Sequence, residues 1–193
     1  MLKQKLMVIL LAAFFASCSN DNKTAGSENT KDSLSEQETT TTAPVSGPHA
    51  NIKLVITGGE MAGTYEAVCR ESCCSFGIAG DKTFGTQYSE EGKGPKELSS
   101  VQMIVNDVTG NKTTDEFTVT FSFGELFGAD SKSFTINTAK GHNDGSGTLS
   151  LEYAADKASV HLQGKTKDGI GLNLEMECHR VATMESIMKE AQK

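Results

Sequence analysis

The sequence predicts an all-β protein: an antiparallel β-sandwich or small barrel of about eight or nine strands, followed by a short C-terminal helix. Two observations support this prediction. The first is that apolar and polar residues alternate in short runs between residues 52 and 178, with Gly-rich turns between the runs. The second is that no long stretch with apolar residues at helical spacing separates the runs, so a parallel sheet built from βαβ units is not expected.

The first predicted strands are short. Run 52–56 opens the folded part, with its apolar side chains on one face. Runs 64–69 and 74–78 follow, and the short polar turn between them predicts a hairpin. Residues 79–97 are rich in Gly and charge, so we expect a loop there, with at most a short strand at 84–88.

Later in the chain the alternation is clearer. Residues 98–108 form the next predicted strand. In residues 117–123, four apolar side chains alternate with Thr and Ser, which is typical of a half-buried strand. Asp168-Gly169 is a strong signal for a hairpin turn. The remaining predicted strands are residues 134–136, 149–153, 158–162 and 170–178.

Residues 183–193 carry a helical pattern. Met184, Ile187 and Met188 recur at helical spacing, and Thr183 is a suitable N-cap. A helix of this length is marginal by itself. We therefore expect the helix either to dock on the β domain or to fray.

The first residues have the layout of a secretory signal. Lys3 and Lys5 precede residues 6–15, an unbroken apolar run that is too short to span a bilayer. Small residues then lead to Cys18. One interpretation is an ordinary cleaved signal peptide whose next residue happens to be Cys. The other is a signal in which Cys18 itself is modified.

The stretch Phe15-Ala16-Ser17-Cys18 resembles the lipobox of bacterial lipoproteins, with Phe15 at the position where Leu is usual. The resemblance covers residues 1–18. It implies that Cys18 receives a diacylglycerol and becomes the N-terminus, so that a lipid anchor holds the protein to a membrane. In Gram-negative lipoproteins an acidic residue after this Cys commonly retains the protein in the inner membrane. Ser19 stands there, which by resemblance favours the outer membrane, facing the periplasm or the cell surface.

Residues 19–48 are predicted to form a disordered linker. Leu34 and Val45 are the only large aliphatic residues in this segment, which cannot bury enough apolar surface to offset the entropy of ordering it. A coil of about 30 residues has an r.m.s. span of roughly 30 Å. This span is enough to hold the following β domain, residues 49–182, clear of a lipid surface.

The chain is acidic. It carries 18 basic and 25 acidic residues, and removal of residues 1–18 takes away Lys3 and Lys5 but no acid, so the formal net charge falls from −7 to −9. A negative chain without a basic cluster argues against nucleic acid as a partner and against electrostatic binding to anionic lipid. We attribute the acidity to solubility.

Four cysteines remain if Cys18 is lipidated: Cys69, Cys73, Cys74 and Cys178. An even number of thiols in an exported domain predicts two disulfides. The preferred pairing joins Cys74 to Cys178 across a loop of about 100 residues, worth about 4–5 kcal/mol in the chain-entropy model, and leaves Cys69 and Cys73 as a short clip. The alternative, Cys69 with Cys178, leaves the adjacent Cys73 and Cys74 as a vicinal bridge or as free thiols.

A cysteine-dependent metal-binding or redox protein is the alternative function. The three early cysteines, together with Cys178 and His179, offer soft ligands that suit copper(I) or zinc. Adjacent residues of a strand point to opposite faces, however, which hinders joint ligation by Cys73 and Cys74. A redox-active dithiol would be expected to show Cys-x-x-Cys at a helix N-terminus, and the sequence has none.

No residue is predicted to be catalytic. His49, His142, His161 and His179 are scattered and lie in no motif, although His161 and His179 are expected on facing strands of one hairpin, where they could be neighbours. No hydrolase, phosphate-binding or dinucleotide-binding motif occurs. The chain has no Trp, which is a common platform in carbohydrate-binding sandwiches.

Two short segments, residues 145–149 and residues 174–178, resemble small antigen-type bacterial lipoproteins, in which a Cys on the last strand closes a β domain. This resemblance implies no defined activity. We therefore expect a non-enzymatic, membrane-anchored lipoprotein of the cell envelope that acts as a binding or interaction module. We expect no cofactor and no metal, and the sequence assigns the module no ligand or protein partner.

Overall fold

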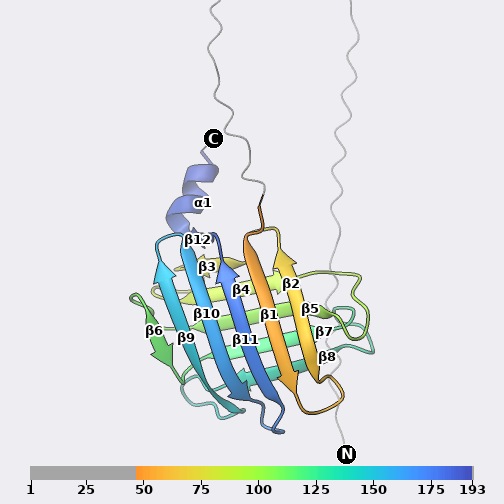
Figure 1. Cartoon of the computed structure of the whole chain (residues 1–193). Helices are drawn as coiled ribbons and strands as arrows, with labels where there is room; N and C mark the ends of the chain where they lie inside the picture. Colours follow the sequence, from red (N-terminus) through yellow and green to blue (C-terminus); the bar gives the residue numbers. More distant parts are fainter. Residues whose placement is uncertain (1–46, 193) are drawn as a thin grey trace, which may run out of the picture. The chain divides into compact units, whose positions relative to one another are not determined.

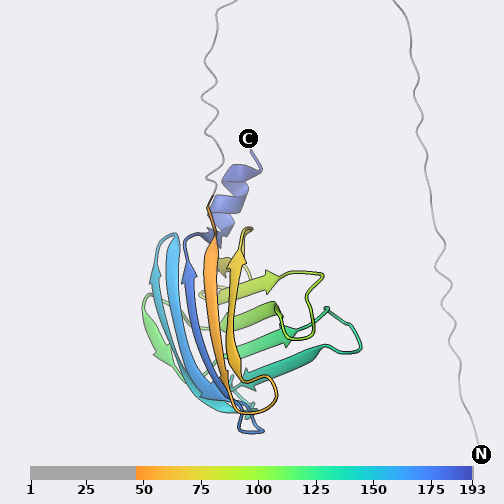
Figure 2. The ribbon, with the colours of Figure 1, turned by 45° about the vertical axis from the view of Figure 1, so that its right-hand side comes forward.

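The computed structural model describes residues 47–192, which fold as two packed β-sheets with a short C-terminal helix (Figure 1). Each sheet has six strands, and the strands of one sheet run across those of the other (Figures 1 and 2). The all-β prediction is confirmed, and the architecture is a sandwich rather than a closed barrel. The signal predicted at residues 1–18, Cys18 included, and nearly all of the linker predicted at residues 19–48 lie outside the described residues.

The first sheet, sheet I, is antiparallel throughout and has the strand order β2-β1-β11-β10-β9-β6. Its long central strands pair in register, so apolar residues form rows across the sheet, such as Leu54, Leu174 and Leu162. Its strands are β1 (Ala50–Thr57), β2 (Gly63–Cys69), β6 (Lys112–Thr114), β9 (Ser146–Ala154), β10 (Lys157–Lys165) and β11 (Gly171–Cys178).

The second sheet, sheet II, has the strand order β12-β3-β4-β5-β7-β8. It is antiparallel except for β12, which pairs in parallel with β3. A β-bulge interrupts the pairing of β5 with β7 between Leu98 and Ser100. The strands are β3 (Cys74–Phe76), β4 (Phe84–Ser89), β5 (Leu98–Val105), β7 (Thr118–Phe123), β8 (Lys132–Asn137) and β12 (Val181–Thr183).

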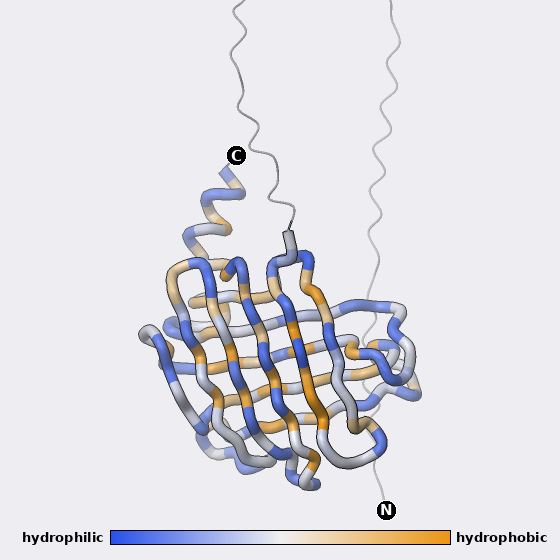
Figure 3. Tube along the Cα trace, viewed as in Figure 1, coloured by the Kyte–Doolittle hydropathy of each residue, from blue (hydrophilic) through white to orange (hydrophobic). Residues whose placement is uncertain are grey.

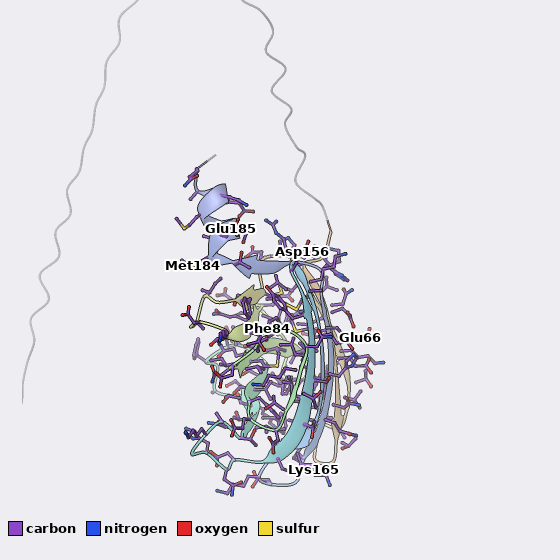
Figure 4. The ribbon with its side chains drawn as sticks, turned by 90° about the vertical axis from the view of Figure 1, so that its left-hand side faces the viewer. Glu66, Phe84, Asp156, Lys165, Met184 and Glu185 are labelled. Atoms are coloured by element: carbon purple, nitrogen blue, oxygen red, sulfur yellow. A yellow bond between two sulfur atoms is a disulfide. The ribbon has the colours of Figure 1, made fainter. Side chains whose placement is uncertain are left out.

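The core lies between the sheets and is built from the alternating apolar residues. Val119, Phe121 and Phe123 of β7 are fully buried, whereas the residues between them are partly exposed. This confirms the faces predicted for residues 117–123. Figure 3 shows the same alternation of apolar and polar residues along the strands of sheet I. In the edge view of Figure 4, Phe84 lies between the two sheets.

A pair of glycines lets the sheets approach closely. Gly147 and Gly164 face each other where β9 pairs with β10. A Cβ on Gly164 would lie 2.7 Å from Cδ1 of Ile136 in sheet II and 2.7 Å from the carbonyl oxygen of Ser146, closer than real Cβ atoms come. Gly164 therefore excludes a side chain, and Ile136 packs against the backbone of sheet I instead.

The hairpin predicted for residues 64–69 and 74–78 is wrong. β2 belongs to sheet I and β3 to sheet II, because the chain between them crosses from one sheet to the other. β3 also ends at Phe76, and Gly77 follows with a φ of 73°, so that Ile78 is 43 % exposed instead of lying on the core face. A short polar connection suits a hairpin and a crossover equally well, so composition does not distinguish them.

The sandwich has twelve strands rather than about eight or nine. Two of the added strands, β6 and β12, have three residues each, too few for an alternating pattern to be recognised. β4 is a full strand within the loop predicted at residues 79–97, and its Phe84 and Tyr88 are buried. β5 ends at Val105, three residues before its predicted end, and Asp107 has a positive φ of 55°.

Helix α1 (Met184–Glu190) begins after Thr183, whose Oγ1 accepts a hydrogen bond from the Ser186 amide, so the predicted N-cap is confirmed. No residue of the helix is buried. Met184 and Met188 are 52 % and 58 % exposed, so the helix forms without docking its apolar side chains on the sandwich. In the described part of the chain, no helix is both long and apolar enough to cross a membrane.

Candidate functional site

Two of the passages of the chain between the sheets, from β2 to β3 and from β11 to β12, lie at one end of the sandwich. β2 ends at Cys69 and β11 ends at Cys178, and both cysteines lie opposite Ala50 of β1, on its two sides. From these ends the chain passes to β3 and to β12, which pair with each other in sheet II. We call this end the disulfide corner (residues 69–74 and 178–183).

The disulfide corner contains both disulfides. Cys74 is bonded to Cys178, with 6.3 Å between their Cα atoms, and this bond links sheet II to sheet I. Cys69 is bonded to Cys73, with 6.5 Å between their Cα atoms. All four side chains are buried. This is the pairing that the sequence analysis preferred, and the bond between Cys74 and Cys178 staples the two sheets together.

The residue that precedes β1 is tied to the same corner. The His49 amide donates a hydrogen bond of 2.8 Å to the carbonyl of Cys69. The His49 carbonyl accepts hydrogen bonds from the amides of His179 at 2.8 Å and Arg180 at 3.3 Å. The two passages at this corner, after β2 and after β11, are therefore hydrogen-bonded to the start of the β domain.

The arrangements expected for metal or redox chemistry are not formed in this structure. The four sulfurs are paired with each other, so none is a free thiolate for copper(I) or zinc. Among residues 47–192, no group of three or more His, Cys, Asp or Glu side chains is arranged to hold a metal ion.

His161 and His179 are not neighbours, contrary to the expectation. His161 lies opposite Glu175 in the pairing of β10 with β11, whereas His179 follows the end of β11. Nε2 of His179 is instead 3.0 Å from Nδ2 of Asn51. The two strands pair as a hairpin, but the register separates the two rings along it.

The outer face of sheet I is charged. Lys53 lies between Glu66 of β2 and Glu175 of β11, and its Nζ is 3.8 Å from Oε2 of Glu175. In Figure 4, Glu66 lies on the outer side of this sheet. We define the charged face by the outward ionisable residues of sheet I, which are Lys53, Glu66, Glu152, Lys157, His161, Lys165, Glu175 and Glu177.

Ser159, His161 and Glu177 bring the residue types of a hydrolase triad together on this face. The Ser159 hydroxyl donates a hydrogen bond of 2.9 Å to Oε1 of Glu177 and lies 3.3 Å from Nε2 of His161. In a catalytic triad the His is the middle member, since it takes the proton of the Ser and is held by the carboxylate. Here the Ser is the middle member, so its hydroxyl proton points to the carboxylate and the three residues form a surface network.

A cleft of about 680 Å³ lies where β2 of sheet I meets β4 of sheet II. In its wall the Tyr88 hydroxyl donates a hydrogen bond of 2.6 Å to Oε2 of Glu90, and Nζ of Lys93 is 3.0 Å from the same oxygen. Burial, and then the bond to Glu90, raise the pKa of Tyr88 far above its ordinary value. The bonds from Tyr88 and Lys93 lower the pKa of Glu90. Neither group is therefore poised to exchange a proton near neutral pH.

The outer face of sheet II is uncharged. The register places its outward residues in three rows that run across the sheet. In the described strands of sheet II, no outward position carries a charged side chain. We call this surface the neutral face, and its rows are Ser89-Ser100-Ser122-Ser133, Gln87-Gln102-Thr120-Thr135 and Ser75-Gly85-Ile104-Thr118-Asn137.

Hydroxyl groups of β7 and β8 pair with each other across the neutral face. The hydroxyl oxygens of Thr120 and Thr135 are 3.0 Å apart, and those of Ser122 and Ser133 are 3.1 Å apart. A hydroxyl donates one hydrogen bond and accepts two, so each pair retains a donor and acceptors for a further partner. The outward hydroxyls of β7 and β8 therefore form an array of groups that both donate and accept.

A groove of about 340 Å³ lies on the neutral face. Gly85 leaves the floor of the groove low because it has no side chain. Ile78 and Ile104 line the groove and are 43 % and 46 % exposed. Gln87 and Gln102 add amide groups. The groove thus offers apolar contact and hydrogen bonding side by side.

Phe127 stands fully exposed in the loop that joins β7 to β8, and this loop projects beyond the sandwich (Figure 2). Its φ is 63°, a conformation that costs a residue other than Gly about 1–3 kcal/mol. Neither burial nor backbone preference accounts for a Phe here. The loop joins the ends of the two strands that carry Ser122 and Ser133, so Phe127 lies beyond the β7 and β8 end of the serine row.

The neutral face is not predictable from the alternation in single strands. That pattern separates the outward residues of β7, Thr118, Thr120 and Ser122, from the core. It does not fix the register between strands, and the rows depend on that register. The available sequence signal is weaker: Lys, Arg, Asp and Glu are missing from alternate positions of several neighbouring runs.

Comparisons of the chain with protein-family models, with curated proteins and with solved structures give no match. The function of the protein therefore has to be inferred from the geometry of residues 47–192 and from the sequence pattern that precedes them.

Proposed function

We propose that the protein is a non-enzymatic binding module that a lipid on Cys18 anchors in the outer membrane of a bacterial cell envelope. The layout of residues 1–18 and its resemblance to a lipobox support the anchor. The polar segment at residues 19–48 supplies a tether of roughly 30 Å r.m.s. span. Ser19, in the place of an acidic residue, supports the outer membrane.

The neutral face is the observation that supports binding. Charged residues make up 22 % of the chain, and the surface of a soluble domain normally carries charges of both signs interspersed. Outward residues of a strand do not fill the core, so folding does not exclude charge from them, as Lys53 and Glu175 on the charged face demonstrate. Charged residues are depleted where proteins contact their partners. A surface kept free of charge across neighbouring strands is therefore expected to meet a partner.

The polar clusters favour binding over catalysis. In the network on the charged face, the Ser159 hydroxyl donates its hydrogen bond to Glu177 instead of His161. In the cleft, the pKa values of Tyr88 and Glu90 are displaced away from neutrality in opposite directions. Neither cluster couples a nucleophile to a base that could activate it.

Fatty-acid labelling tests the anchor. Cells that express the protein are grown with a radioactive fatty acid, and we expect the wild-type protein to incorporate the label. Cys18→Ser is expected to stay unlabelled, as a precursor or a soluble product, because the thiol is the acceptor for lipid. Ser19→Ala, one residue away, should retain the label. Incorporation that persists in Cys18→Ser would refute the anchor.

Co-sedimentation with envelopes tests the binding face. The soluble product of the Cys18→Ser chain is mixed with envelopes from cells that lack the protein, so that retention reports the β domain and neither the lipid nor the apolar run at residues 6–15. Thr120→Lys places a charge in the middle of the neutral face and should lower retention about fivefold or more, the equivalent of roughly 1 kcal/mol. Ser150→Lys, on the outer side of sheet I, should leave retention unchanged. Equal retention of both variants would place the binding surface elsewhere.

A further inference from the structure

We infer that the neutral face binds an uncharged glycan, a polymer of neutral sugars in the cell envelope. The inference rests on the proposed function and names the ligand chemistry of the same surface. Three properties of the neutral face support it: the lack of charge, the regular spacing of its hydrogen-bonding groups, and the apolar contacts in its groove and at its margin.

The lack of charge selects against ionic ligands. An anionic polymer or a lipid headgroup would lose its hydration on this surface without gaining a counter-charge, because the outward residues of the described strands of sheet II include no Lys or Arg. The net charge of −7 over the chain also repels anions. A cationic ligand would need carboxylates, and those of Glu66 and Glu175 lie on the opposite face of the sandwich. A neutral ligand is the remaining class.

The hydrogen-bonding groups of the neutral face match those of sugars. Hydroxyl and amide groups can each donate and accept, as sugar hydroxyls do, so a contact can be satisfied in either direction. Neighbouring strands lie about 4.8 Å apart, and outward residues along one strand lie about 7 Å apart. The Gln-Thr row is therefore spaced on the scale of a sugar ring, and a glycan lying along it meets a polar group at each of its four strands. In the serine row, Ser100 is only 3 % exposed, so Ser89, Ser122 and Ser133 are the residues available to a ligand.

Apolar groups suited to the C–H faces of sugar rings occur at two places. Ile78 and Ile104 line the groove, and the exposed Phe127 lies in the loop that joins β7 to β8, beyond the end of the serine row. Tyr, Trp and Arg, which dominate the binding hot spots of protein partners, are missing from the outward residues of the described strands of sheet II. This favours a glycan over a folded protein. Each sugar binds weakly without a Trp platform, and repeated sites along a polymer supply the avidity.

Phe127 separates a binding role from a structural one. Phe127→Gly removes the backbone strain of a positive φ, so the thermal midpoint of the protein should stay the same or rise. The same exchange removes an aromatic ring from the margin of the face and should lower glycan retention about threefold or more. A loss of stability together with unchanged retention would give Phe127 a structural role instead.

The test uses envelope glycan, prepared by delipidating and protease-digesting envelopes from cells that lack the protein. We expect the Cys18→Ser chain to sediment with this material and to be released once periodate has cleaved the vicinal diols of its sugars. Gln102→Glu, an isosteric exchange in the middle of the neutral face, should weaken retention roughly fivefold to tenfold. Gln163→Glu, the same exchange on the outer side of sheet I, should have no effect. Added salt should leave retention unchanged.

Other outcomes overturn the inference in distinguishable ways. Retention on intact envelopes that survives periodate but is lost after protease identifies a protein partner and leaves the proposed function standing. Retention that falls as salt is added identifies a charged ligand. A dimer in sedimentation equilibrium that Gln102→Glu dissociates identifies a second copy of the chain as the occupant. No retention on intact envelopes removes the proposed function as well.

Discussion

The two outer faces of the sandwich differ in charge although they cover the same core. On both sheets the inward residues are apolar and buried, as Phe121 of β7 and Leu174 of β11 show. The outward residues of sheet I include Lys53 and Glu175, whereas those of sheet II are hydroxyls, amides and one exposed Ile104. Packing explains what the faces share, and it does not explain the difference in charge between them.

Strand propensity explains only part of the neutral face. Thr is favoured in strands, which suits Thr118 and Thr120. Propensity gives no reason for the serine row, and burial gives none for an Ile104 that is 46 % exposed. Glu and Lys are disfavoured in strands and still occupy the outer side of sheet I without breaking its pairing. Contact with a partner is a sufficient cause for leaving charge out of sheet II.

The largest expected effect is the loss of stability that a carboxylate causes on the inner side of β7, compared with its outer side. Phe121→Asp puts an unpaired carboxylate at a position with no solvent exposure and should lower the free energy of unfolding by more than about 4 kcal/mol. Thr120→Asp, one residue away on the neutral face, should lower it by less than about 1 kcal/mol. Urea titration of the two variants measures both values. Similar losses would show that β7 does not have one buried and one free side.

The next largest loss of stability is expected from breaking a disulfide in the disulfide corner, which links the two sheets. Replacing Cys74 and Cys178 together by Ala should lower the free energy of unfolding by about 4–5 kcal/mol, because the bond closes a loop with a sequence separation of 104. The same exchange at Cys69 and Cys73, whose separation is 4, should lower it by about 2 kcal/mol. Denaturant titration measures the two losses.

A control on the wild-type protein accompanies the disulfide variants. Peptide mass spectrometry without reductant should recover the two bonded pairs, and titration of the unreduced protein should find no reactive thiol. A Cys69–Cys178 peptide would contradict the pairing. Four free thiols that bind a stoichiometric metal ion would contradict the structural role of these residues and support a metal-binding protein.

A smaller expected difference between the two faces is how far the effect of a substitution on stability depends on salt. Lys53→Met leaves Glu66 and Glu175 on either side of an uncharged residue, and should lower the free energy of unfolding by about 0.5–1 kcal/mol at low salt. This loss should shrink as salt is added. Thr135→Val breaks the hydroxyl pair with Thr120 on the neutral face, and its effect should not depend on salt. Salt dependence in the Thr135 variant would show that charges influence the neutral face after all.

The smallest expected effect on stability comes from the cleft between β2 and β4, where the Tyr88 hydroxyl donates a hydrogen bond to Glu90. The pKa of Tyr88 is raised, so this group adds stability below the unfolded pKa of about 10 and loses it as the pH rises further. The pKa of Glu90 is lowered, so it adds stability above the unfolded pKa of about 4.3 and loses it as the pH falls. Glu90 is half exposed, so solvent screening limits its share to a few tenths of a kcal/mol, on the order of surface pairs.

Tyr88→Phe should flatten the dependence of unfolding free energy on pH at both ends, because it removes the titrating hydroxyl and the bond that lowers the pKa of Glu90. Denaturant titrations in acid and in alkali, on the wild-type protein and this variant, give the comparison. Tyr65→Phe, whose hydroxyl bonds to the Met61 carbonyl and not to a carboxylate, is the control and should leave the acid limb unchanged. Parallel pH profiles for wild type and Tyr88→Phe would exclude the coupling.

The sequence was sufficient where a strand is long and buried on one side only. Residues 117–123 and 170–178 alternate because one side packs in the core, and this places Cys178 inward, where it bonds to Cys74. The same logic fails for β6 and β12, whose three residues are too few to show a period. It also fails for β2 and β3, because a short polar connection does not reveal whether the chain turns back or changes sheet.

The neutral face could not be predicted from the sequence, for a different reason. Its serine row combines residues from four strands, and its Gln-Thr row combines another residue from each of the same strands. Rows of this kind are set by the register between strands, which local alternation leaves open. Phe127 gives no local signal either, since its exposure and positive φ appear only in the folded loop.

Hydroxyl-radical footprinting tests most directly whether the neutral face meets a partner. Ile104 on the neutral face and Val68 on the outer side of sheet I are 46 % and 47 % exposed, so they provide matched aliphatic probes. The lipid-anchored protein in its own envelopes is compared with the same protein extracted into detergent, and oxidation is read by mass spectrometry. We expect oxidation of Ile104 to fall several-fold in the envelopes while oxidation of Val68 does not change. Equal oxidation of Ile104 in both states, or protection of Val68 alone, would contradict a neutral face that contacts a partner.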